Sequence, residues 1–155
     1  MKAAENRIGK GERFMAQHRV TRKGPLLDEK GRLVEPGYAT SLIKEYNRKD
    51  IAANKLRIKE WDYYLIQSDL FALALTIADN GYMGMDSISF MWFDEAKGSN
   101  TQSKIVPLTM GKRKLPATSE IGDIAVSGKG YDITFQNDGK KRRLFGHMEN
   151  FAKGM

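Results

Sequence analysis

The chain has 155 residues, no cysteine and a formal net charge of +7. This length is typical of one domain with a sizeable core. Without cysteine there can be no disulfide, thiolate metal site or cysteine nucleophile, and nothing indicates an oxidising compartment. The charged N-terminus lacks the apolar stretch of a signal peptide, and no apolar run is long enough to span a bilayer. We therefore expect a cytoplasmic protein without a membrane span.

The positive charge is unevenly distributed along the chain. Residues 1–59 contain 15 basic and 7 acidic residues, residues 60–110 contain 2 and 7, and residues 111–155 contain 9 and 5. The acidic middle segment also holds most of the aromatic residues, whereas a sheet that binds nucleic acid needs aromatic and basic groups on the same surface. The charge distribution therefore disfavours a nucleic-acid-binding module, which remains a distant alternative, and the excess of basic residues mainly favours solubility.

The N-terminal third is predicted to be irregular, with one helix. Residues 1–24 are polar and aperiodic, which is typical of a mobile tail, and residues 25–155 are predicted to form a single β-rich domain. In the segment PLLDEKGRLVEPGYA, Asp28 and Gly31 suit the first and last positions of a turn in a small hairpin. An imperfect apolar stripe predicts one short helix, or two, over residues 40–55.

Period-two alternation predicts two groups of strands. Residues 61–68, 71–79 and 86–93 alternate as three consecutive antiparallel strands of a meander. Residues 107–116, with two prolines and a basic tract, are interpreted as a long loop. Three further short strands are predicted over Ile124–Val126, Tyr131–Gln136 and Lys141–Phe145, and the Asn137-Asp138-Gly139 turn pairs the last two.

These elements predict a mainly β protein, with an antiparallel meander plus a hairpin forming an open barrel or sandwich and one short N-terminal helix against an opening or face. No segment after the last strand can cover its edge, and folded proteins normally protect such edges. We therefore expect the edge to be closed by a barrel, by the rest of a longer chain, or by self-association through the exposed strand.

A face of small side chains predicts a site for an apolar or amphipathic small molecule. Ala72, Ala74, Thr76 and Ala78 share one face of their strand, and a neighbouring strand adds Ser87 and Ser89. Such a face can floor a ligand cavity, or it can simply allow a helix or second sheet to approach closely. The aromatic residues that we expect around this ligand site are Trp61, Tyr63, Tyr64 and Trp92.

Two carboxylates suggest an alternative function as an enzyme. Asp62 and Asp86 are predicted on strand faces that also carry apolar residues, where burial would raise their pKa values and suit one of them to proton transfer. The alternative is therefore a hydratase- or isomerase-type enzyme, although each aspartate can equally cap a buried donor. Neither histidine has a partner at metal-ligand spacing, and no complete phosphate-binding loop is present, so the sequence predicts no metal and no cofactor.

Several separated segments resemble one known family. They are PLLDEKGRLVEPGYA, EYNRKDIAANKLRIKEWDYY, LALTIADNGYMG and RRLFGHM. Together, over residues 18–155, they resemble the N-terminal half of an uncharacterised microbial protein family, the domain of unknown function 2804. The resemblance implies a longer pattern of about twice this length, of which this chain is a fragment. It also implies a calycin-like architecture of two β-barrel or β-sandwich halves, as in carotenoid hydratases and small-molecule binders, and it supplies no catalytic residues.

Overall fold

Residues 60–107 form a four-stranded antiparallel sheet in which each strand pairs with the next along the chain. The computed structural model describes residues 17–152. The strands of this sheet are β3 (Glu60–Gln67), β4 (Phe71–Asp79), β5 (Met83–Trp92) and β6 (Ser99–Pro107). Their register is continuous, so side chains alternate between the two faces without interruption. The predicted meander is confirmed, including the strand over residues 71–79, whose Leu and Ala content also suits a helix.

The fourth strand of this sheet was not predicted. β6 has the sequence SNTQSKIVP, which is rich in the Ser, Thr and Asn side chains that are typical of loops. It pairs with β5 over nine residues, from Met83↔Pro107 to Met91↔Ser99. Tertiary pairing thus overrides a weak local preference.

A second antiparallel sheet follows in the C-terminal part of the chain. Its strands, in order, are β7 (Ile124–Gly128), β8 (Tyr131–Asn137) and β9 (Arg142–Met148). Gly130 and Gly139 occupy the two connecting turns with φ angles of +73° and +84°, which glycine adopts without steric cost. The predicted strands and the pairing of residues 131–136 with 141–145 are confirmed.

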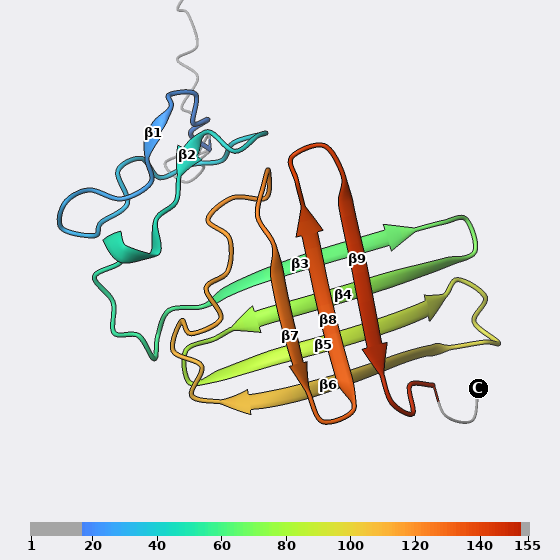
Figure 1. Cartoon of the computed structure of the whole chain (residues 1–155). Helices are drawn as coiled ribbons and strands as arrows, with labels where there is room; N and C mark the ends of the chain where they lie inside the picture. The colour runs from blue at the N-terminus through green and yellow to red at the C-terminus, as the bar shows by residue number, and fades with distance from the viewer. Residues whose placement is uncertain (1–16, 153–155) are drawn as a thin grey trace, which may run out of the picture.

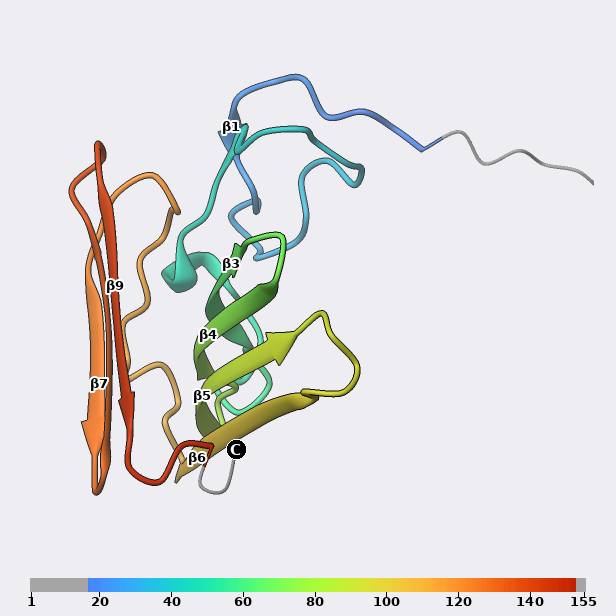
Figure 2. The same ribbon diagram turned by 90° about the vertical axis from the view of Figure 1, so that its right-hand side faces the viewer.

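The two sheets stack as layers, and the strands of the smaller sheet run across those of the larger one (Figures 1 and 2). Apolar side chains from both sheets meet between the layers and form the core. One ring contact joins the layers directly, because Tyr64 of β3 packs edge-on against Phe135 of β8 with ring centroids 4.8 Å apart. The buried core cluster consists of Leu75, Ile77, Ile88, Ile124, Tyr131, Ile133, Phe135 and Met148.

The N-terminal segment contains short extended pieces rather than the predicted helix. β1 (Gly24–Pro25) and β2 (Lys44–Glu45) pair in parallel, and Leu27 bridges Leu33 across the expected turn. The prediction of a helix over residues 40–55 is wrong: only a three-residue 3₁₀ turn, η1 (Arg48–Asp50), is present there. β2 holds part of the stripe extended, and the Asn47 side chain accepts a bond from the Lys49 N–H, which favours a turn over a helix.

Both larger sheets are open. Their edges are β3 and β6 in one and β7 and β9 in the other, so neither sheet closes into a barrel. Residues 1–16 of the predicted tail lie outside the described residues, whereas Arg19 forms a bridge with Tyr38. Among residues 17–152, no helix is long and apolar enough to cross a membrane.

Candidate ligand-binding site

Six of the predicted ligand-binding residues lie on one face of the four-stranded sheet. Across the ladder, Tyr63 is opposite Thr76, and Thr76 is opposite Ser87. Trp61, Ala72 and Ala74 share this face by the same alternation. The face points away from β7–β9 (Figure 2), and we call it the outer face.

The other two predicted residues lie on the opposite, inner face. Tyr64 packs against Phe135 in the core, and Trp92 lies at the far end of β5 in a cluster with Phe71 and Phe90. Tyr63 and Tyr64 are neighbours in one strand and therefore point to opposite faces. The structure thus does not bring Tyr64 and Trp92 to the small-residue face.

The aromatic residues of the outer face are exposed to solvent. The side chains of Trp61 and Tyr63 are 61% and 52% exposed, whereas Ala72, Ala74 and Ala78 between the larger side chains are buried. The small residues therefore form the floor of an exposed surface. A ligand needs concave walls as well as a floor. A pocket with such walls lies at one end of β3, and of the eight predicted ligand-binding residues only Trp61 lines it.

This pocket, which we call the Asp62 pocket, has a volume of about 360 Å³. Three segments that are distant in the sequence form it: residues 42–51 of the N-terminal segment, residues 59–62 at the beginning of β3, and residues 115–119 of the loop between β6 and β7. Its residues are Leu42, Tyr46, Ile51, Lys59, Glu60, Trp61, Asp62, Leu115, Pro116, Ala117, Thr118 and Ser119.

A polar cluster fixes one wall of the Asp62 pocket. The carboxylate of Glu60 accepts a hydrogen bond from the Tyr46 hydroxyl and forms an ion pair with Arg48. The Arg48 guanidinium lies against Gly111, where a Cβ atom would approach it to 2.5 Å. The N-terminal segment is thus tied both to β3 and to the loop after β6. Sequence reasoning missed Tyr46, Glu60 and Arg48, because their contacts join segments with no shared local pattern.

Asp62 is the free acid of this pocket. Its side chain is partly buried, and its carboxylate has no hydrogen-bond or ion-pair partner among residues 17–152. Burial raises the pKa of the Asp62 carboxyl above its ordinary value, because removal from water disfavours the charged form. Such a group can accept a bond from a ligand when ionised and donate one when protonated.

Asp86 is in a very different position. It is 0% exposed, and its carboxylate accepts bonds from both terminal nitrogens of Arg113 and, at 2.9 Å, from the Tyr131 hydroxyl. The Arg113 guanidinium lies directly over Gly84, where a Cβ atom would be 2.5 Å away. Asp86 therefore joins the two sheets and the loop after β6, and these bonds favour a structural role over proton transfer.

Asp79 organises the loop that carries Arg113. Its Oδ1 accepts bonds from the Gly81 N–H at 3.0 Å and the Thr109 hydroxyl at 2.8 Å, and its Oδ2 accepts one from the Gly111 N–H at 2.8 Å. This carboxylate thus links the β4–β5 turn to the start of the loop whose later residues line the Asp62 pocket. From the sequence alone, Asp79 was placed only at the end of a predicted strand.

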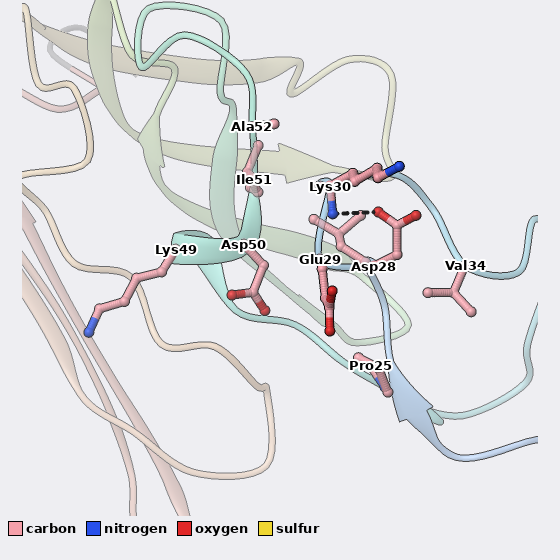
Figure 3. Close-up of a pocket in the computed structure, with 11 residues that line it drawn as sticks. Pro25, Asp28, Glu29, Lys30, Val34, Lys49, Asp50, Ile51 and Ala52 are labelled. Atoms are coloured by element: carbon pink, nitrogen blue, oxygen red, sulfur yellow. Dashed lines mark hydrogen bonds between the residues drawn. The ribbon is translucent and has the colours of Figure 1, made fainter.

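A larger pocket of about 730 Å³ lies within the N-terminal segment (Figure 3). Its three carboxylates belong to Asp28, Glu29 and Asp50. The Asp28 carboxylate already accepts hydrogen bonds from the Lys30 N–H, at 2.9 Å, and from Arg32. No group of acidic or histidine side chains in the described part of the chain is arranged to hold a metal ion. We therefore place the candidate site at the Asp62 pocket.

Fold and site together define a mainly β protein of two open antiparallel sheets with a pocket at the end of the larger one. The chain belongs to the family described as domain of unknown function (DUF2804), whose model matches residues 17–155. The comparisons with curated proteins and with solved structures found no match.

Proposed function

We propose that this protein binds an apolar or amphipathic small molecule in the Asp62 pocket. The observation that supports it is a partly buried carboxyl without a partner among residues 17–152, in a pocket whose apolar walls include Ile51 and Leu115 and, from the other face of β3, Trp61. Binding pockets typically combine an apolar lining with a few polar groups that orient the ligand. In this proposal the apolar walls hold the body of the ligand, and Asp62 binds its polar end. The calycin-like resemblance of the sequence agrees with such a role.

Because the chain has only two tryptophans, ligand binding in this pocket can be measured by fluorescence. Replacing Trp92 with phenylalanine leaves Trp61, which lines the pocket, as the single tryptophan. Titration of this variant with N-phenyl-1-naphthylamine, a neutral apolar probe, should quench Trp61 fluorescence with a dissociation constant in the micromolar range. Ala117→Phe fills the pocket and should weaken binding by at least about tenfold.

Ala125→Phe is the matched control for this titration. Ala125 is exposed on the three-stranded sheet, outside the pocket, and gains the same side chain. Binding should be the same in this variant as in the Trp92→Phe parent. Equal loss of binding in both variants, or full binding in Ala117→Phe, would show that the probe binds elsewhere and would refute the proposal.

The raised pKa of Asp62 gives a pH test of the same site. Below the ordinary aspartate pKa the carboxyl is neutral in the folded and the unfolded chain, and it costs no stability. As the pH rises, the unfolded chain ionises first, so stability is lost until the pH exceeds the folded pKa of Asp62. Asp62→Asn should therefore match the wild type at about pH 3 and be more stable at neutral pH. Thermal unfolding across this range measures the difference, and an equal effect at all pH values would contradict it.

The second candidate function is proton transfer by Asp62 in a hydratase- or isomerase-type reaction. Its raised pKa and its position in the pocket favour this, because a general acid must be protonated near the working pH and lie beside the ligand. Asp62→Asn separates the two functions. A binding protein keeps the neutral probe in this variant and transfers no deuterium from D₂O to unsaturated ligands in either form. An enzyme shows such transfer in the wild type alone.

A further inference from the structure

The outer face of the four-stranded sheet carries no charged side chain. By the continuous register, 18 residues point outward from β3 to β6, and none is Asp, Glu, Lys or Arg. Charged residues make up 29% of the chain, so a surface of average composition would carry roughly five charges at these positions. The five charged residues of these strands all lie on the inner face, toward β7–β9: Glu60, Asp62, Asp79, Asp86 and Lys104.

This arrangement reverses the usual pattern of a solvated sheet. The outer face of the three-stranded sheet shows the ordinary arrangement, with Asp132, Arg143 and His147 among its side chains. The outer face of the larger sheet instead exposes the side chains of Tyr63, Leu65 and Ile105, by 52%, 50% and 57%. These exposed apolar side chains lie on the two edge strands of the face, β3 and β6, with buried alanines of β4 between them. Exposed apolar surface on a sheet face is typical of an interaction site.

We propose that this outer face binds the same face of a second copy of the chain, forming a symmetric dimer. Four strands about 4.8 Å apart and about nine residues long cover roughly 19 by 30 Å, and the accessible surface of such a face approaches the ~800 Å² per partner of a stable interface. Two molecules of net charge +7 can meet here without bringing charged side chains of the sheet together. The charge distribution therefore favours this face over the others for self-association.

Near the middle of the strands, the sizes of the outward side chains are also complementary between copies. A two-fold axis parallel to the strands, through the middle of the sheet, places β3 of one copy over β6 of the other. The large outward residues of β3 are Trp61, Tyr63 and Leu65. The rotation keeps each residue at its own level along the strands, so Tyr63 faces Ser103 and Leu65 faces Thr101, whereas Trp61 faces Ile105. β4 and β5, with their small central residues, lie over each other and allow close approach.

Sedimentation equilibrium of the full chain tests the dimer. Between about 1 and 100 μM the mass should rise from the 17.5 kDa of one chain to twice that value. Added salt should strengthen association, because it screens the repulsion between like net charges and the interface holds no ion pair to weaken. Tyr63→Lys and Ser103→Lys, on opposite edges of the face, should each raise the dissociation constant by at least about tenfold, since each buries an unpaired charge.

Phe145→Lys is the matched control. Phe145 is 53% exposed on the outer face of the three-stranded sheet, and the variant gains the same charge. Its dimer should be unchanged. A chain that stays monomeric up to the highest concentration would overturn the proposal, as would a dimer that survives both Tyr63→Lys and Ser103→Lys, because pairing through a strand edge would then explain it. Circular dichroism checks folding, and Ser103→Lys, at an exposed polar position, carries the test if Tyr63→Lys does not fold.

Discussion

Replacing Arg113 with methionine should lower the free energy of unfolding by about 3–5 kcal/mol. The methionine fills much of the space but leaves the Asp86 carboxylate buried without its cation, with only the Tyr131 hydroxyl as a donor. Removing a charge from water without compensation costs more than the ion pair contributes. Denaturant unfolding followed by circular dichroism measures the change.

Two further variants distinguish the loss of charge from the loss of packing. Lys112→Met removes a neighbouring exposed charge and should change stability by less than about 0.5 kcal/mol. The double variant Asp86→Leu with Arg113→Met should recover most of the loss, because an apolar pair of similar size replaces a buried ion pair at little cost. If the double variant is as unstable as Arg113→Met, the loss arises from packing of the guanidinium over Gly84 rather than from charge.

Asp79→Ala should have an effect of similar size, and it should also weaken probe binding. The Asp79 carboxylate accepts bonds from Gly81, Thr109 and Gly111, and bonds to a charged group contribute about 1.5–3 kcal/mol each. Since the buried Thr109 hydroxyl also loses its partner, we expect the free energy of unfolding to fall by at least about 3 kcal/mol. Loosening the loop after β6 also displaces residues 115–119, which line the Asp62 pocket.

Asp69→Ala is the control for this change, because Asp69 is an exposed acid in the neighbouring β3–β4 turn. Stability and probe binding should both remain at the wild-type level. A loss below about 1 kcal/mol in Asp79→Ala would show that backbone pairing, rather than the carboxylate, organises the loop.

Most of the fold prediction was based on the period-two alternation of apolar and polar residues. It identified β3, β4 and β5, and it placed Asp62 and Asp86 on the apolar inner face, because each strand keeps an unbroken register. It failed for β6, whose hydroxyl-rich sequence has no apolar alternation, and for residues 40–55, where pairing with β1 prevents a helix. Alternation is a local pattern. It therefore cannot identify a strand such as β6, which is fixed by pairing with β5 and not by its own apolar residues.

The candidate site was less predictable than the fold. The expected ligand site grouped Tyr63 with Tyr64 by residue type, although the same alternation puts them on opposite faces. The Asp62 pocket arises where residues 42–51, the start of β3 and residues 115–119 converge. Asp62 was identified as a candidate acid because its strand position predicted burial. The loop residues that enclose it have no motif that could have indicated their place.

The order of the strands has a consequence for how the chain acquires its structure. Each larger sheet is built from one continuous stretch, residues 60–107 and residues 124–148, and every hydrogen-bonded neighbour in it is also the next strand in sequence. Hairpins of this kind close short loops and form on the microsecond scale of local contacts. Contacts between distant segments come instead from the stacking of the layers, as in Tyr64 with Phe135, and from the loop after β6, where Asp79 binds Thr109 and Gly111. We therefore expect the barrier to folding to lie mainly in bringing these distant segments together rather than in pairing neighbouring strands.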